Sequence, residues 1–132
     1  YVAHACKKVV GVESVPDAIV AAKENAKRNK IDNATFKVGD MRKVFTDSFV
    51  KRYNTPDIII TDPPRDGMHK DVIEQLLKVS PSKILYISCN PSTQARDLAM
   101  LKDAYKVELS QAVDMFPHTQ HVENIVLLSK VS

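Results

Sequence analysis

A cysteine stands where a short apolar segment gives way to a helix-start signal, in the stretch YISCNP at residues 86–91. Asn90 can cap a following helix and Pro91 suits its first turn, so the thiol of Cys89 would lie beside a helix N-terminus. The partial positive charge of such a terminus favours a thiolate over a thiol. Cys89 is therefore a candidate nucleophile; the alternative, a small buried hydrophobe, is what we expect of Cys6.

Asp62 is a second group that could do chemistry, because it follows a wholly apolar run and precedes two prolines, Pro63 and Pro64. Consecutive prolines restrict the backbone and donate no amide hydrogen, so the loop after Asp62 is expected to be rigid. A rigid loop could hold a flat substrate or the tail of a cofactor near the carboxylate. The alternative is a stiff turn that has no chemical role.

Three further acids occupy informative positions. Glu13 ends an apolar run and could accept hydrogen bonds from the hydroxyls of a ribose, or it could be a capping or surface acid. Asp40 could accept from an adenine amino group, or it could be an ordinary turn aspartate. Glu123 could serve as a general base if its loop folds over Cys89, and the alternative is an edge glutamate.

The elements that must position these residues alternate regularly along the chain. Apolar runs predict strands at 9–13, 34–38, within 56–64, and at 83–88, 106–113 and 122–130, and helical spacing predicts helices near 16–29, 44–50, 70–79 and 92–101. The continuous apolar run of the third strand indicates burial on both faces, as in parallel sheets. The last two strands have no helix between them, so they should pair antiparallel. The pattern is typical of an α/β, doubly wound, mostly parallel sheet, within one domain over 1–132.

Ligands of such sheets bind beyond the carboxyl ends of the strands. Four of the candidates follow or end predicted strands: Glu13, Asp40, Asp62 and Cys89. We therefore expect these four side chains on one rim of the sheet.

The composition is that of an ordinary soluble chain, with 132 residues, 44% hydrophobic and 27% charged residues, and a net charge of +3. No apolar run approaches the roughly 20 residues of a membrane span. His118 and His121 have no companions at metal-ligand spacing, so we expect no metal site. Two cysteines without a pairing pattern favour a reduced, cytoplasmic protein that has no membrane partner.

Taken together, three motifs resemble those of the S-adenosylmethionine-dependent RNA uracil-5-methyltransferases. They are Asp62-Pro63-Pro64-Arg65-x-Gly67, Ser88-Cys89-Asn90-Pro91, and the segment from Asp114-Met115-Phe116-Pro117 to His121-Val122-Glu123. The resemblance covers nearly the whole chain, in order and spacing. It implies a Rossmann-like class I methyltransferase fold, S-adenosyl-L-methionine as cofactor and an RNA substrate, with 23S ribosomal RNA slightly preferred to transfer RNA.

The resemblance also implies a role for each candidate. Cys89 would attack C6 of a uracil to activate C5, and Glu123 would later remove the C5 proton. Glu13 would hold the cofactor ribose, with Asp40 near the adenine. Asp62 would lie by the methionine end of the cofactor and the target base, which must leave its stack to reach the thiol.

The sequence departs from that family in lacking a first strand and its glycine-rich loop, an RNA-binding domain and a cysteine cluster. We therefore expect a partial catalytic domain that is inactive alone, binds cofactor weakly or not at all, and has an exposed seam that encourages pairing of chains. One rival is an amino-directed nucleic-acid methyltransferase, but these usually have an aromatic residue where Arg65 stands, and they need no thiol. The other is a non-catalytic RNA-binding fragment, which would have no need of Cys89, Asp62 and Glu123 together.

Overall fold

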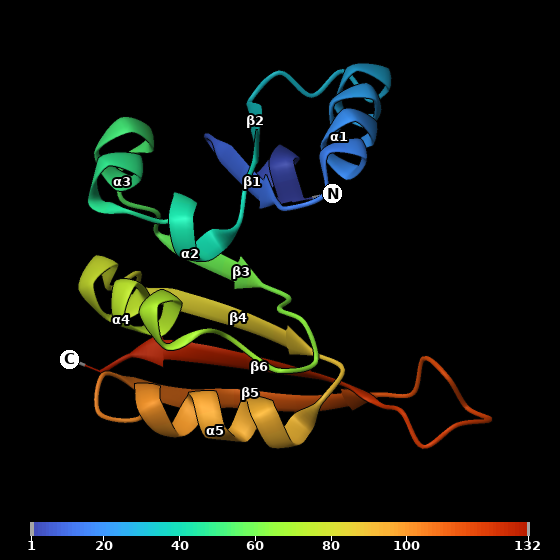
Figure 1. The fold of residues 1–132 in the computed structure, drawn as a ribbon, viewed down its shortest axis with the longest axis vertical. Coiled ribbons are helices and arrows are strands. Elements are labelled where there is room, and N and C mark those ends of the chain that lie inside the picture. Colours follow the sequence, from blue (N-terminus) through green and yellow to red (C-terminus); the bar gives the residue numbers. More distant parts are fainter. Residues whose placement is uncertain (1, 132) are drawn as a thin grey trace. The chain divides into compact units, whose positions relative to one another are not determined.

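The computed structural model describes residues 2–131, which form two compact units that meet in sequence between Tyr53 and Asn54. Figure 1 shows the helices and strands of both. No helix in the described residues combines the length and the apolar character needed to span a membrane. The prediction of a single domain over 1–132 stays a prediction.

The first unit is a two-stranded parallel sheet with a helix packed on it. Its elements are η1 (Val2–Ala5), β1 (Val9–Glu13), α1 (Pro16–Arg28), β2 (Ala34–Val38), α2 (Met41–Val44) and α3 (Asp47–Tyr53). β1 and β2 pair in register from Val9 opposite Ala34 to Glu13 opposite Val38. Helix α1 connects the two strands and buries Ile19 against them, as its apolar spacing predicts.

The single helix predicted near 44–50 is wrong, because two short helices occupy this region. The side chain of Asp40 caps the first, α2, and the chain leaves helical geometry at Phe45. Thr46 then accepts a hydrogen bond from the amide of Phe49 through its hydroxyl, which starts α3. Phe45 itself is buried.

The second unit is a four-stranded sheet in the order β3-β4-β6-β5. Its elements are β3 (Ile58–Thr61), α4 (Lys70–Val79), β4 (Lys83–Ser88), α5 (Pro91–Leu101), β5 (Tyr105–Val113) and β6 (Glu123–Lys130). β3 is parallel to β4, whereas β6 runs antiparallel to both β4 and β5. The predicted antiparallel terminal pair is confirmed. Figure 1 shows α4 and α5 lying along this sheet.

The core of the second unit lies on the sheet face that these helices cover. On β4, Ile84 and Tyr86 stand directly opposite Leu128 and Val126 of β6, and each is at most 1% exposed. Leu76 of α4 is buried to the same extent. Burial of large apolar side chains is the dominant stabilising contribution in such a layer.

Within the second unit no described element covers the opposite face of β3, in contrast to the predicted burial on both faces. Ile58 and Ile60 are 55% and 49% exposed. Because side chains alternate along a strand, Ile59, which pairs with Ile84, faces the helices, whereas its two neighbours face away from them. Neither α4 nor α5 can therefore shield Ile58 and Ile60.

Candidate active site

Cys89 occupies the turn between β4 and α5 that the sequence predicts. Ser88, the last residue of β4, accepts a hydrogen bond from the amide of Asn90 through its hydroxyl oxygen, at 3.1 Å. Asn90 in turn caps α5 by accepting from the amide of Ser92 at 3.2 Å, and Pro91 is the first residue of the helix. Cys89 is a free thiol of intermediate exposure. Cys89 is therefore not enclosed in the apolar core. Cys6, which we expected to be a small buried hydrophobe, is exposed, so that prediction is wrong.

Asp62 is the first residue after β3, the strand next to the one that Cys89 follows. The parallel pairing of β3 with β4 ends at Thr61 opposite Tyr86, so Asp62 and Cys89 follow the carboxyl ends of neighbouring strands. Asp62 is exposed, and within residues 2–131 its carboxylate has no hydrogen bond or ion pair. The carboxylate is thus free to accept from a ligand.

Glu123 reaches the same end of the sheet from the other direction. It is the first residue of β6, and the antiparallel ladder places Asn124 opposite Ser88. The next step of that ladder would set Glu123 opposite Cys89. Glu123 is of intermediate exposure. The structure therefore gathers Cys89, Asp62 and Glu123 at one edge of the second unit.

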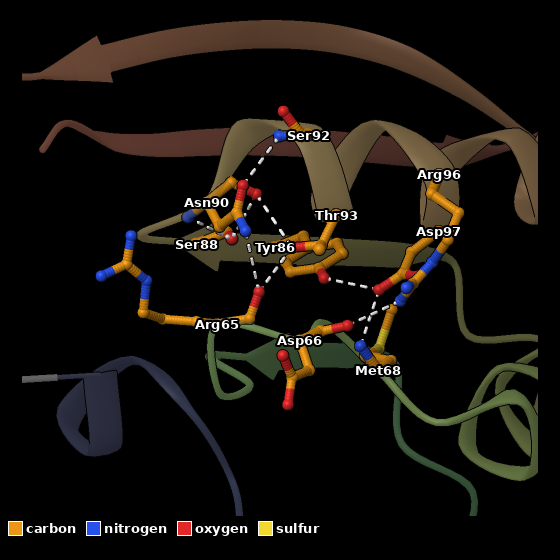
Figure 2. A network of polar contacts seen from close by, with 10 residues as sticks. All are labelled: Arg65, Asp66, Met68, Tyr86, Ser88, Asn90, Ser92, Thr93, Arg96 and Asp97. Atoms are coloured by element: carbon orange, nitrogen blue, oxygen red, sulfur yellow. Dashed lines mark hydrogen bonds and ion pairs between the residues drawn. The ribbon is translucent and has the colours of Figure 1, made fainter.

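Helix α5 and its cap bind the loop that follows Asp62 at three points (Figure 2). Besides the two described next, the guanidinium of Arg96 donates to the carbonyl oxygen of Asp66 at 2.8 Å. At the first, the carbonyl oxygen of Arg65 accepts from the side-chain amide of Asn90 at 3.0 Å and from the hydroxyl of Thr93 at 2.9 Å. At the second, the carboxylate of Asp97 accepts from the amide of Met68 at 2.7 Å.

Asp97 is a fully buried carboxylate that the sequence reasoning missed. Besides Met68, it accepts from the hydroxyl of Tyr86 at 2.7 Å and forms an ion pair with Arg96 at 2.7 Å. Burial first, and the hydrogen bond to Asp97 second, raise the pKa of Tyr86 above its ordinary value. The signal was present in the sequence, because Asp97 lies four residues before Leu101 on the apolar stripe of its helix.

A second buried contact joins α5 to β6. Gln94 donates from its side-chain nitrogen to the carbonyl oxygens of Tyr86 and Asn124, at 3.0 and 3.2 Å. Asn124 returns a hydrogen bond to the side-chain oxygen of Gln94 at 2.7 Å. The strand that begins at Glu123 is thereby fixed to the helix that follows Cys89.

Glu13 and Asp40 lie in the first unit, both at the carboxyl end of its sheet. One oxygen of Glu13 accepts from the amide of Val15 at 2.9 Å and from the hydroxyl of Ser14 at 3.0 Å. The Val15 amide is the larger cause and the Ser14 hydroxyl the smaller, and together they lower the pKa of Glu13. Asp40 accepts from the amide of Arg42 at 2.9 Å. Glu13 thus bonds to the two residues that precede α1, and Asp40 caps α2; both acids remain exposed to solvent.

Comparison with known proteins gives the family. Residues 1–131 match the family model described as tRNA (Uracil-5-)-methyltransferase. The chain belongs to this family. The resemblance that the three sequence motifs indicate is confirmed.

Relatives within the tRNA (uracil-5-)-methyltransferase family are much longer than this chain. An uncharacterized RNA methyltransferase of Bacteroides thetaiotaomicron is 54% identical over 128 residues, which are 97% of this chain and 28% of the relative. One from Porphyromonas gingivalis is 50% identical over 130 residues, with the same coverage. The chain therefore spans about 28% of the length of these curated relatives.

Solved structures agree with the family and the fold. The tRNA (uracil-54, C5)-methyltransferase of Pyrococcus abyssi, crystallised with S-adenosyl-L-homocysteine, aligns with a TM-score of 0.83 at 40% identity, over 97% of this chain and 30% of that chain. A rRNA methylase of Streptococcus thermophilus aligns with a TM-score of 0.74 at 12% identity, over 99% of this chain and 78% of that chain, and so shows the fold alone. The predicted α/β class I methyltransferase fold is confirmed.

Proposed function

We propose that the protein containing this chain methylates C5 of a uridine in RNA, with S-adenosyl-L-methionine as methyl donor. The observation that carries the proposal is the position of Cys89, Asp62 and Glu123 at the same end of three neighbouring strands, β4, β3 and β6. Family membership supports it, as does the Pyrococcus abyssi relative, whose structure holds S-adenosyl-L-homocysteine. A nucleophile, an unpaired acid and a candidate base on one rim fit covalent activation of a pyrimidine.

The reaction needs a thiol because C5 of uracil is a weak nucleophile. In the proposed mechanism the Cys89 thiolate forms a bond to C6, and the displaced electron pair makes C5 enolate-like. S-adenosyl-L-methionine would supply the electrophilic methyl group that C5 accepts, and it would leave as S-adenosyl-L-homocysteine. Glu123 then removes the proton from C5, the C5–C6 double bond re-forms and the thiolate leaves. Asp62 would position the base or the methionine end of the cofactor with its free carboxylate.

We assign the ribose and adenine of the cofactor to the two acids of the first unit. Glu13 carries an exposed carboxylate, and an ionised carboxylate can accept hydrogen bonds from two ribose hydroxyls. Asp40 is exposed at the same end of that sheet and could accept from an adenine amino group. Since the chain spans about 28% of its relatives, we further propose that it binds cofactor weakly on its own, which calorimetry can measure.

A suicide substrate tests the mechanism in the full-length protein. RNA containing 5-fluorouridine should form a stable covalent adduct, because no base can remove fluorine from C5 as it removes a proton. Cys89→Ser should abolish the adduct. Cys6→Ser is the matched control, since Cys6 is the other free cysteine and should be dispensable. Methyl transfer that survives Cys89→Ala would favour an amino-directed methyltransferase instead.

The RNA substrate and the compartment are further proposals. We expect 23S ribosomal RNA, with transfer RNA as the competitor because the Pyrococcus abyssi relative is named for it. Sequencing the nucleotide trapped in the fluorouridine adduct would decide between them. Two free thiols are consistent with the reducing cytoplasm.

A further inference from the structure

Asn90 performs two functions with one side chain. Its oxygen accepts from the amide of Ser92 and so begins the helix that follows Cys89. Its nitrogen donates to the carbonyl oxygen of Arg65, 25 residues earlier in the chain. The residue that shapes the Cys89 turn therefore also grips the loop after Asp62, as Figure 2 shows.

Thr93 adds a second donor to the same carbonyl. Its hydroxyl oxygen lies 2.9 Å from the carbonyl oxygen of Arg65 and 3.1 Å from that of Asn90. A hydroxyl has one proton, and the shorter contact is the one to Arg65. Two donors on one carbonyl oxygen fix its position better than a single hydrogen bond does.

Because the Arg65 carbonyl is held in place, the position of the nearby Asp62 is restricted as well. Only Pro63 and Pro64 separate Asp62 from Arg65, and their restricted backbone leaves little freedom between the two residues. The guanidinium of Arg65 meanwhile extends away from the network (Figure 2), and the side chain is exposed. The two hydrogen bonds from Asn90 and Thr93, which we call the clamp, therefore fix the backbone at Arg65. They leave its guanidinium free to contact RNA.

We propose that Asn90 and Thr93 are positioning residues that hold the Asp62–Arg65 segment in place beside the nucleophile Cys89. The proposal rests on the proposed function, because it takes Cys89 to be the group that attacks the base. Small displacements of groups that orient a substrate are costly, and a shift of about 1 Å can lower a rate about 100-fold. Loss of either donor should therefore slow formation of the covalent bond more than it weakens RNA binding.

Two substitutions in the full-length protein remove the donors and leave the helix start intact. Asn90→Asp keeps the oxygen that caps α5 but places a second oxygen against the Arg65 carbonyl. Thr93→Val keeps the shape of the side chain and removes its hydroxyl. With fluorouridine RNA, we expect each variant to form the adduct about tenfold more slowly. The KM for unmodified RNA should stay within about twofold and the thermal midpoint should be nearly unchanged, since the cap is kept.

Matched variants separate positioning from folding. Thr93→Ser restores a hydroxyl and should recover most of the rate. Ser92→Ala is the neutral control, because Ser92 is exposed and contributes only its amide to the cap. If Asn90→Asp lowers the thermal midpoint, the comparison of Thr93→Val with Thr93→Ser decides the question.

The adduct measurements test the role of Asn90 and Thr93 separately from the proposed function. If Cys89→Ser abolishes the adduct while Asn90→Asp and Thr93→Val react within about twofold of the parent protein, the clamp has no positioning role and the inference fails alone. If Cys89→Ser still forms the adduct, the proposed function fails, and the inference fails with it.

Discussion

Ser88 and Asn124 are direct partners where β4 runs antiparallel to β6, one residue before Cys89 and one residue after Glu123. The candidate nucleophile and the candidate base therefore come from neighbouring strands whose offset is set by main-chain hydrogen bonds. Gln94 reinforces that offset by bonding to Asn124 from the helix that follows Cys89. Such an arrangement allows one group to attack a pyrimidine ring and the other to remove a proton from it.

Replacement of Glu123 should separate these two steps. In the full-length protein, Glu123→Gln should still allow Cys89 to add to the uracil and C5 to be methylated, but the C5 proton would stay in place. We expect turnover to fall about 100-fold or more, the usual contribution of a general base. A methylated protein–RNA adduct should accumulate with ordinary uridine RNA and be visible on a denaturing gel.

Glu108→Gln is the matched control for this substitution. Glu108 lies on β5 of the same sheet, where it pairs with Lys106 at 3.0 Å. The Glu108→Gln variant should methylate RNA at the rate of the parent protein. Normal turnover by Glu123→Gln, or lost turnover without an adduct, would contradict the assignment of Glu123 as the base.

Glu13→Gln should weaken cofactor binding and leave RNA binding intact. A hydrogen bond to a charged group is worth about 1.5–3 kcal/mol, so we expect S-adenosyl-L-homocysteine to bind about tenfold or more weakly to the full-length variant. Calorimetry measures the change. Glu24→Gln on α1 is the control, because Glu24 is exposed and its one ion pair, to Arg28, is long at 3.9 Å. Equal affinity of the two variants for the cofactor would mean that Glu13 does not bind it and serves only its local hydrogen bonds with Ser14 and Val15.

The sequence predicted the elements of the fold well because each is locally determined. The bounds of β1, β2, β4 and α4 agree with prediction, since apolar runs and clear start signals mark each of them. Burial of β3 was not predictable from local pattern. Its apolar run indicates two covered faces, but cover depends on which elements pack there, and Ile58 and Ile60 remain exposed.

The sequence predicted which residues of the candidate site could react, but not which residues hold them in place. Asp62 and Cys89 stand out because each follows an apolar run and precedes a distinctive local signal, two prolines after Asp62 and a helix start after Cys89. The partners that hold them, such as Thr93 and Asp97, come from a helix surface, and their contacts span 28 or 29 residues of sequence. No local pattern reveals a contact between a loop carbonyl and a hydroxyl on a later helix.

Gly67 tests how closely the Asp62 loop packs on α5. Its φ of +81° is one that other residues rarely adopt, and an added Cβ would lie 2.6 Å from the carboxylate of Asp97 and 2.7 Å from the guanidinium of Arg96. Gly67→Ala should therefore destabilise the protein by about 2 kcal/mol and disturb the loop. Denaturant unfolding measures the stability, and adduct formation with fluorouridine RNA measures the loop. A variant with unchanged stability would show that the loop can move away from α5 at little cost.

The hydrogen bond from Tyr86 to Asp97 should make stability depend on alkaline pH. The pKa of Tyr86 is raised above its ordinary value of 10.0 in the folded protein, first by burial and then by Asp97. A raised folded pKa gives a stabilisation that is complete below the unfolded pKa and declines as the pH rises toward the folded one. Above a pH of about 10, the unfolded state alone releases the proton, and this lowers the free energy of unfolding by up to about 1.4 kcal/mol per pH unit.

Tyr86→Phe isolates this contribution, because it removes the titrating hydroxyl and keeps the ring. The variant should be less stable than the parent protein near neutral pH, since Asp97 loses a donor. Above a pH of about 10, the difference in unfolding free energy between the two proteins should shrink, because only the parent loses the tyrosine contribution. Urea unfolding at several pH values between about 8 and 11 measures both curves. A difference that stays constant across this range would mean that the Tyr86 hydroxyl titrates alike in the folded and unfolded states.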